Sequence, residues 1–309
     1  MSQERLYYIL FDSETSQVER QASTGTRLNS LFGALTSVFG VTGSSAAWPP
    51  PSGNNPLQFT PVTSGSNGPQ YGPITSGSLN GVKVLAILTR WNYATDGSAP
   101  FSAGEINAIQ QWVSGGGSLL LMSNHGRFPR NSTVWSQNDA ALASAFGFSL
   151  GDVGITNQSS MLRMSGSNFS RPTGPALSGA RQIFSGVTSI GAHDGCGITL
   201  GQNVSGPGGS VTYSPLVSFP VGAYVYAPTG TPPTGEYPSG QYFAACAQYY
   251  RGKVVVVANS GMVGDVGNRQ PAAGLAPYGN NLLFVLNAFS WLAGIPAWNP
   301  VTGRPLNGG

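Results

Sequence analysis

The sequence predicts an α/β fold with a parallel central sheet and a β-rich insertion, and three stretches carry this prediction. Residues 82–122 read as strand, helix and strand, the unit that joins two parallel strands by a right-handed crossover. Residues 252–259, GKVVVVAN, are apolar without alternation, as in a strand buried on both faces. Residues 279–293 have the apolar spacing of an amphipathic helix, and Gly294 follows as a stop signal.

The start of the chain adds a further strand and helix. Residues 6–11, LYYILF, predict a buried strand that ends at Asp12. Residues 27–39 place apolar side chains at helical spacing, and Gly40 is a plausible helix stop. Residues 43–80 are rich in Gly, Ser, Pro and Asn, so we expect a long irregular loop there.

The strand–helix–strand unit has clear internal boundaries. Its first strand covers residues 82–89 and its second covers residues 118–122. Ser102 is the expected N-cap of the helix, and Glu105, three residues later, completes a capping box. The helix is expected to continue to about Val113, before three consecutive glycines.

The second half of the chain changes in character. Residues 136–146 predict another helix. Between residues 150 and 250, short apolar runs alternate with turn signals, which indicates a β-rich elaboration. Residues 297–309 read as a tail. We therefore expect one α/β domain over residues 1–296.

Composition and charge exclude some classes of partner. Charged residues make up only 8% of the 309 residues, against about 25% in an average protein. The net charge of +3 is spread thinly, and nucleic acid is not expected as a partner because phosphate binding needs clustered Lys and Arg. No apolar run approaches the roughly 18 residues of a membrane span, so none is expected. The first residues show no signal-peptide pattern. The composition suits an extracellular or envelope protein, and the compartment stays open.

No cofactor or metal is expected. A Walker A motif and a G-x-G-x-x-G motif in the right context are both missing from the sequence. Cys196 and Cys246 lie too far apart to read as a zinc motif. They form either one disulfide or two separate thiols, and the sequence does not decide between these.

Polar residues follow four of the predicted strands. In open parallel sheets, ligands bind beyond the carboxyl ends of the strands. We therefore expect these residues to converge on one rim. The candidates are Asp12, Glu14, Trp91, Asn92, Ser123, Asn124, His125, Asn259 and Ser260.

One interpretation of this rim is catalytic. His125 would be a general base, Asp12 or Glu14 would orient it, and Ser123 or a water would be the nucleophile. The alternative is that His125 satisfies backbone groups of its loop, because no G-x-S-x-G elbow is present.

Other polar and aromatic residues each have two interpretations. The stretch from His193 to Cys196 suggests thiol or metal chemistry, or an ordinary turn. Asp265 either faces the rim or caps a turn. Aromatic residues in or near loops suit sugar stacking, or they anchor the loops to the body of the protein. These aromatic residues are Trp48, Trp91, Tyr93 and Trp135.

Four motifs in order resemble a known superfamily. They are Gly116-Gly117, the turn from His125 to Pro129, the strand from Gly252 to Ser260, and the helix end from Asn287 to Gly294. Together they are similar to the class I glutamine amidotransferase-like superfamily, in particular its DUF4350-type bacterial branch. The resemblance covers most of residues 6–294 and implies a flavodoxin-like three-layer fold.

The sequence departs from the superfamily at the reactive position. Glutaminases of this kind need a cysteine on a strand-to-helix elbow, within reach of a His-Glu pair. The matching elbow here is Ser123-Asn124-His125, and no His-x-Glu occurs in the sequence. Glutaminase activity is therefore not expected.

Three functions remain as hypotheses, and whether the chain is an enzyme stays open. The first is a non-glutaminase domain that binds a small polar ligand at the rim, with a glycan among the candidates. The second is a hydrolase that uses Ser123 or a water with His125 as general base. The third is a structural, self-assembling protein, because a low-charge surface opposes association little.

Overall fold

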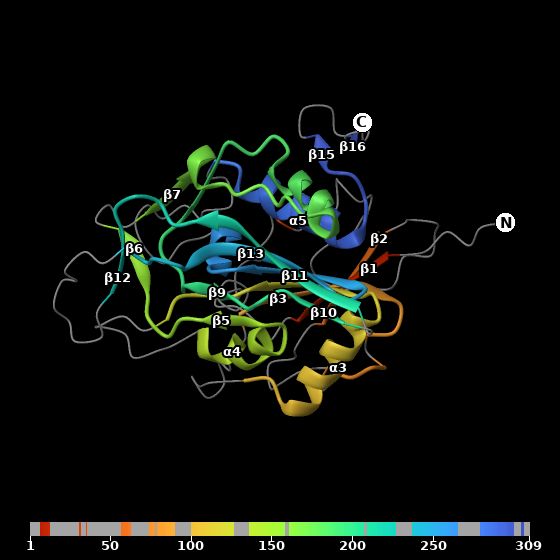
Figure 1. Ribbon diagram of the computed structural model, residues 1–309. Coiled ribbons are helices and arrows are strands. Elements are labelled where there is room, and N and C mark those ends of the chain that lie inside the picture. Colours follow the sequence, from red (N-terminus) through yellow and green to blue (C-terminus); the bar gives the residue numbers. More distant parts are fainter. Residues whose placement is uncertain are drawn as a thin grey trace, which may run out of the picture.

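A twisted central sheet with helices on both faces organises the computed structural model (Figure 1). The structure describes residues 31, 35, 74–77, 79–89, 100–126, 136–157, 161–206, 209–226, 237–264 and 279–297, and the backbone of 7–12, 57–62, 298–299 and 304–305.

Five neighbouring strands of the sheet are parallel. In spatial order they are β2 (Leu57–Val62), β1 (Tyr7–Asp12), β3 (Val82–Leu88), β4 (Ser118–Met122) and β14 (Gly252–Val257). Three antiparallel strands extend the sheet beyond β14: β13 (Tyr242–Tyr249), β11 (Gly209–Ser218) and β10 (Val204–Gly206). The parallel strands follow the 2-1-3-4-5 order of flavodoxin-like folds. The fold class expected from the sequence is confirmed.

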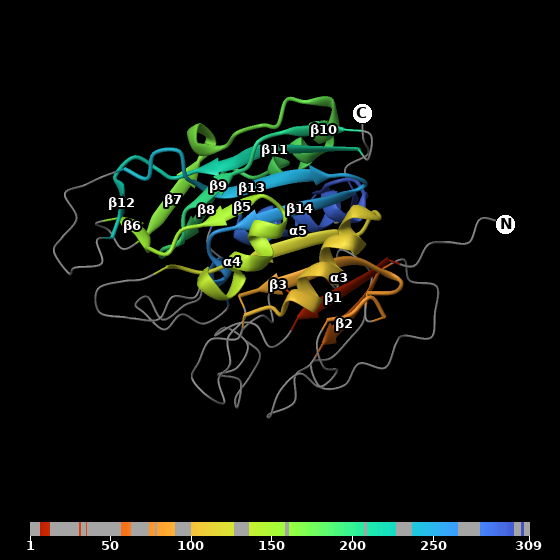
Figure 2. The same cartoon turned by 60° about the horizontal axis from the view of Figure 1, so that its bottom comes forward.

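Helices cover both faces of this sheet, as the two views in Figures 1 and 2 show. One face carries α3 (Ala103–Ser114) and α4 (Ser136–Ala145). The other carries α5 (Asn281–Ala293) and the 3₁₀ helix η2 (Pro175–Phe184). The predicted capping box of α3 is present, because the Glu105 N–H donates to Ser102 Oγ and the Ser102 N–H donates to Glu105 Oε2.

Short strands between α4 and α5 extend one end of the molecule, at the left in Figure 1. β7 pairs with β8, β6 pairs with β12, and β5 reaches the main sheet through β9. The bounds are β5 (Phe148–Leu150), β6 (Ile155–Asn157), β7 (Leu162–Ser165), η1 (Gly166–Asn168), β8 (Ser189–Ala192), β9 (Ile198–Leu200), β12 (Ala223–Val225) and η3 (Ser260–Val263).

Two stretches differ from the sequence expectations. Residues 57–62, expected within an irregular loop, form β2, which pairs with β1 at the edge of the sheet. An edge strand tolerates Pro61, whereas a central strand would not. In the expected tail, β15 (Trp298–Asn299) pairs with β16 (Arg304–Pro305).

The predicted helix at 27–39 falls largely outside the described residues. Leu31 and Leu35, four positions apart, are helical and fully buried. No helix in the described part of the chain is long and apolar enough to cross a membrane.

Gly252 sits where three elements approach one another most closely. It opens β14, opposite the end of α3 and the start of β4. A Cβ at this position would collide with the backbone carbonyl oxygens of Val113 and Gly117. Only glycine allows the central strand to start so close to its neighbours, which explains the first residue of the GKVVVV motif.

We therefore expect Gly252→Ala to lower the free energy of unfolding by more than about 4 kcal/mol, because backbone atoms must move in a packed region. Gly166→Ala is the matched control, since its added Cβ meets nothing within 4 Å. That control should stay within about 0.5 kcal/mol of the parent chain. Urea denaturation of both variants checks this, and equal midpoints would show the close approach to be unimportant.

Candidate functional site

Three polar segments that are distant in sequence meet at the carboxyl ends of β4 and β14. The register pairs Val257 with Met122, so the residues that follow them lie side by side. The Ser123 N–H donates to Val257 O at 2.8 Å, and the Ser260 N–H donates to Ser123 O at 2.6 Å. The third segment, His193 to Cys196, is attached to the second through the Cys196 N–H, which donates to Ala258 O at 3.2 Å.

A buried amide and carboxylate cluster links these segments. Asn259 Nδ2 donates to Asn124 Oδ1 at 3.2 Å and to Asp194 Oδ1 at 2.8 Å. Asn124 Oδ1 also accepts from the His125 N–H at 2.8 Å, so it is an oxygen and not a nitrogen. Both partners of Asn259 are therefore acceptors, and they fix which end of its amide carries the N–H groups.

Asn259 and its neighbour Ser260 each carry a polar atom that has no partner among the residues that the structure describes. They are Asn259 Oδ1 and Ser260 Oγ, on residues that are 4% and 1% exposed. A buried polar atom without a hydrogen bond costs about 1–3 kcal/mol. A Cβ at Gly261 would lie 3.0 Å from Asn259 Oδ1, so the glycine leaves that oxygen uncovered on its side. Both atoms are closed off from solvent, so they are the unpaired polar atoms in the buried layer beneath the rim.

Ser123 is held by an aspartate from the next helix. Its Oγ donates to Asp139 Oδ2 at 2.8 Å, and both residues are fully buried. Asp139 lies in the first turn of α4, where the helix dipole favours a carboxylate. A hydroxyl has one proton, so Ser123 cannot donate to His125 at the same time.

His125 lies beside this pair but contacts the backbone. Its Nδ1 is 2.6 Å from the carbonyl oxygen of Gly126. The hydrolase hypothesis needs the Ser123 hydroxyl to donate to His125, but this hydroxyl donates to Asp139 instead. The roles of His125, Ser123 and Asp12 in catalysis stay a prediction that this geometry does not favour.

The two cysteines are separate buried thiols, which decides the question that the sequence left open. Cys196 lies next to Ser123, and its Sγ is 3.7 Å from Ala258 O. Burial first, and the Asp139 carboxylate second, raise the pKa of the Cys196 thiol to about 12. Burial also raises the pKa of Cys246. Both thiols are protonated at neutral pH and are poor nucleophiles.

Thr89 is a strained residue at the end of β3. Its φ of 55° lies in the left-handed region, which a β-branched residue rarely adopts. It is buried, and its Oγ1 donates to Met122 O at 3.1 Å, which ties the end of β3 to the end of β4. Such strain costs of order 1–3 kcal/mol and clusters at functional sites.

The structure brings together part of the predicted rim. Ser123, Asn124, His125, Asn259 and Ser260 meet in it. The backbone of Asp12 ends β1, two strands away from β4. The remaining candidates lie outside the described residues: Glu14, Trp48, Trp91, Asn92, Tyr93, Trp135 and Asp265.

Sequence patterns do not assign three residues near the rim to it: Asp139, Thr89 and Asp194. For Asp194 the sequence suggests only metal or turn chemistry. Asp194 here accepts from Asn259, and the described residues hold no group of three or more His, Cys, Asp or Glu side chains suited to a metal ion. A carboxylate in the first turn of a helix was the available signal for Asp139.

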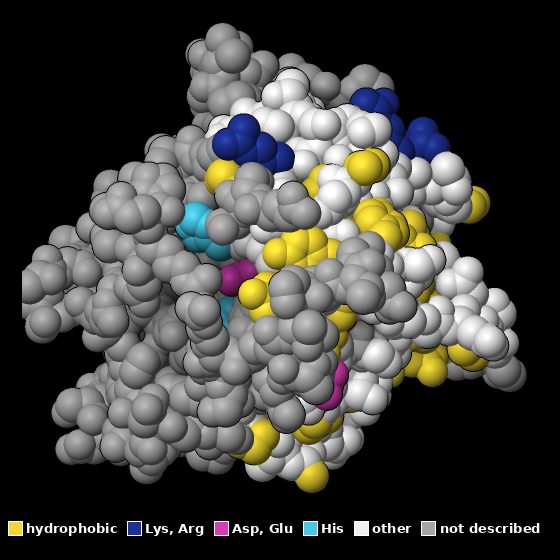
Figure 3. Space-filling view, turned by 90° about the vertical axis from the view of Figure 1, so that its left-hand side faces the viewer, with side chains coloured by type: hydrophobic (Ala, Val, Ile, Leu, Met, Phe, Trp, Pro, Cys, Tyr) yellow, Lys and Arg dark blue, Asp and Glu magenta, His cyan; other side chains and the backbone are white. Residues whose placement is uncertain are grey.

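Histidine and acidic side chains also reach the surface at one end of the molecule (Figure 3). The His193 to Cys196 segment bridges to β6 through Gly195 and Ile155, so the cluster lies at the end where β6 and β12 are found. Figure 3 faces that end, and histidine and acidic side chains come to its surface side by side.

Comparisons with known proteins support the fold and no more. No protein-family model matches the chain, and no match was found among curated proteins. The N-terminal domain of mmIFT52 is similar in structure, with a TM-score of 0.54 and 15% identity over 92% of this chain and 96% of that domain. Two bacterial proteins are more distant. The cytoplasmic protein STM1381 from Salmonella typhimurium LT2 has a TM-score of 0.45 and 14% identity, covering 92% of this chain and 99% of its own. A putative ThuA-like protein from Bacteroides uniformis has a TM-score of 0.43 and 11% identity, covering 94% and 93%.

The two buried serines of the cluster should respond differently to removal of their hydroxyl groups. Ser123→Ala takes a hydrogen bond from buried Asp139, so we expect a loss of about 1–3 kcal/mol in the free energy of unfolding. Ser260→Ala removes a hydroxyl that no described residue pairs with, and we expect at most about 0.5 kcal/mol. Denaturant titration measures both, and equal losses would contradict the assignment.

Neither thiol should react with a disulfide reagent such as 5,5′-dithiobis(2-nitrobenzoate) at pH 7.5 while the chain is folded. Both are buried and protonated, so reaction has to wait for local or global opening. In 6 M guanidinium chloride both should react within seconds. A thiol that reacts equally fast in the native chain would show that the site is open to solvent.

Proposed function

We propose that the chain binds a small, neutral, polyhydroxylated ligand at the rim formed by the ends of β4 and β14. One observation carries the proposal: Asn259 Oδ1 and Ser260 Oγ lie side by side in sequence, are buried, and have no partner among the described residues. Ligands of open parallel sheets bind at this edge. A glycan is one member of this ligand class.

The chemistry of the two atoms selects the ligand. Asn259 Oδ1 only accepts hydrogen bonds, whereas Ser260 Oγ both donates and accepts. A pair of neighbouring hydroxyl groups meets both needs. The Asp194 carboxylate lies in the same cluster, where it accepts from Asn259, so a negatively charged ligand is disfavoured there. Trp91, Asn92 and Glu14 remain proposed further contacts, with the indole suited to stacking on a sugar ring.

This proposal fits a non-glutaminase member of the class I glutamine amidotransferase-like superfamily, in its DUF4350-type branch. The flavodoxin-like strand order supports it. The position of the usual nucleophile carries Ser123, whose proton is engaged by Asp139, beside a thiol with a pKa of about 12. These groups favour binding without covalent chemistry.

A panel of neutral monosaccharides and polyols at millimolar concentration tests the proposal by saturation-transfer NMR and calorimetry. The parent chain should bind at least one member. Gly261→Ala places a methyl group against Asn259 Oδ1, so it should weaken that binding at least tenfold. Ser260→Ala removes one hydrogen bond and should weaken it three- to tenfold, which corresponds to about 0.5–1.5 kcal/mol.

Ser149→Ala, at an exposed position of β5, is the matched control and should bind like the parent. Failure of every panel member to bind, or equal affinity of Gly261→Ala and the parent, would overturn the proposal.

A further inference from the structure

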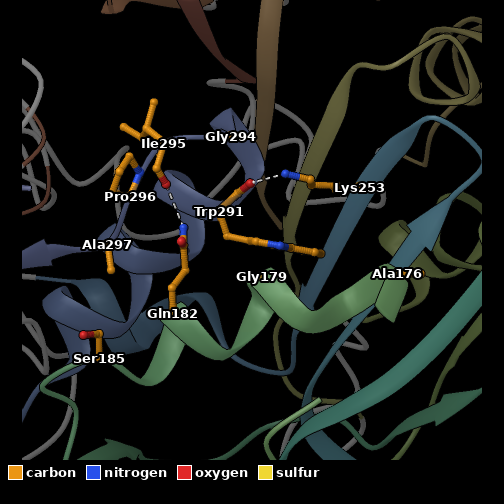
Figure 4. A pocket seen from close by; sticks show the side chains of 10 residues that line it. All are labelled: Ala176, Gly179, Gln182, Ser185, Lys253, Trp291, Gly294, Ile295, Pro296 and Ala297. Carbon is orange, nitrogen blue, oxygen red and sulfur yellow. Dashed lines mark hydrogen bonds between the residues drawn. The ribbon is translucent and has the colours of Figure 1, made fainter. Parts of the chain in front are cut away.

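A concave region lies at the other end of the parallel strands, away from the rim. Lys253 is the second residue of β14, and Trp291 is in the last turn of α5. Together with η2 and residues 294–297 they line a hollow of about 570 Å³ (Figure 4). A second hollow of about 380 Å³ adjoins it, because Gln182 and Ser185 of the η2 region line both.

Cations concentrate in these two hollows. The part of the chain described with side chains has six basic residues, and three of them line the pair of hollows: Lys253 the larger, Arg171 and Arg181 the smaller. None of the described lining residues is acidic. In a chain with only 8% charged residues, such a gathering without carboxylates indicates a site for negative charge.

Lys253 is placed to receive an anion. Its Nζ donates to Trp291 O at 2.6 Å and lies 5.1 Å from the centroid of the indole ring. Its partners among the described residues are a carbonyl oxygen and an indole ring, and no carboxylate of those residues neutralises it. Burial first, and nearby Lys83 second, lower the pKa of Lys253 to about 8. A bound anion would compensate for both effects.

The larger hollow also has donor groups and open space. Gln182 Nε2 donates to Ile295 O at 2.8 Å, which holds the rim of the hollow in place. Gly179 leaves the indole edge of Trp291 uncovered, since a Cβ there would lie 3.5 Å from Trp291 Nε1. The indole N–H has no acceptor among the described residues, and Trp291 lines the hollow, so this group is a further donor for a ligand there.

We propose that this double hollow binds a small molecule with two anionic groups, one held by Lys253 and the other by Arg171 and Arg181. The shared wall of Gln182 and Ser185 would lie along the middle of the ligand. Arginine suits a carboxylate or phosphate because its planar group donates to two oxygens at once. Among the described residues, Arg181 donates only through Nε, to Pro172 O. The combined space matches that of small-molecule sites.

Calorimetry with inorganic pyrophosphate, and with inorganic phosphate as the single-group reference, tests the proposal at low ionic strength. Pyrophosphate should bind at least tenfold tighter than phosphate. Lys253→Met keeps the aliphatic stem and removes the charge, and it should weaken pyrophosphate binding at least tenfold. Arg171→Gln and Arg181→Gln should each weaken it three- to tenfold.

Two variants distinguish binding in the hollows from nonspecific attraction of anions to a protein with a net positive charge. Gly179→Leu keeps all three cations and fills the larger hollow, so it should weaken binding at least tenfold. Arg163→Gln removes an exposed charge on β7, outside both hollows, and should change nothing. Ser260→Ala, at the rim, should also leave pyrophosphate binding unchanged. Equal binding of phosphate and pyrophosphate, or equal losses in Arg163→Gln and Lys253→Met, would overturn the proposal.

Discussion

The parallel pairing of β14 with β4 is the contact on which the rest of the structure depends. It joins segments more than 130 residues apart and is possible only because Gly252 lets the strand start against two carbonyl oxygens. The same pairing fixes what lies at each end of β14. Its carboxyl end holds Asn259 against Asn124, and its amino end holds Lys253 against the last turn of α5. One strand therefore positions both of the regions to which we assign ligands.

The sequence predicted the elements whose signals are local. The strand–helix–strand unit with its capping box, the buried run at 252–257 and the last helix are all present, because periodicity and capping act within a few residues. Strand β2 was missed because its only described partner is β1, some 50 residues away, and Pro61 argues against a strand. The rim was predicted in outline from topology. Its hydrogen bonds were not, because Asp194 and Asn259 are 65 residues apart and nothing local pairs them.

Buried polar contacts hold the elbow after β4 in place. A sulfur does stand beside this elbow, but Cys196 comes from a different segment and is sealed in the core. Burial is the main cause that raises the pKa of this thiol, and the Asp139 carboxylate adds to it. Three hydrogen bonds hold the surrounding elements together here. Ser123 bonds to Asp139 of α4, Thr89 at the end of β3 bonds to β4, and Asn259 bonds to the segment that carries Asp194.

The two outer strands of the described sheet have a consequence for the behaviour of the protein in solution. Unpaired sheet edges template aggregation, and many proteins block them with lysine side chains. Only 8% of the residues of this chain are charged. The outer strands of the described sheet are β2, which contains a proline, and β10, which is three residues long. A missing N–H group and a short strand offer little to an incoming chain. Dissolved salt screens charge repulsion but cannot restore an absent donor, so this protection persists at high ionic strength.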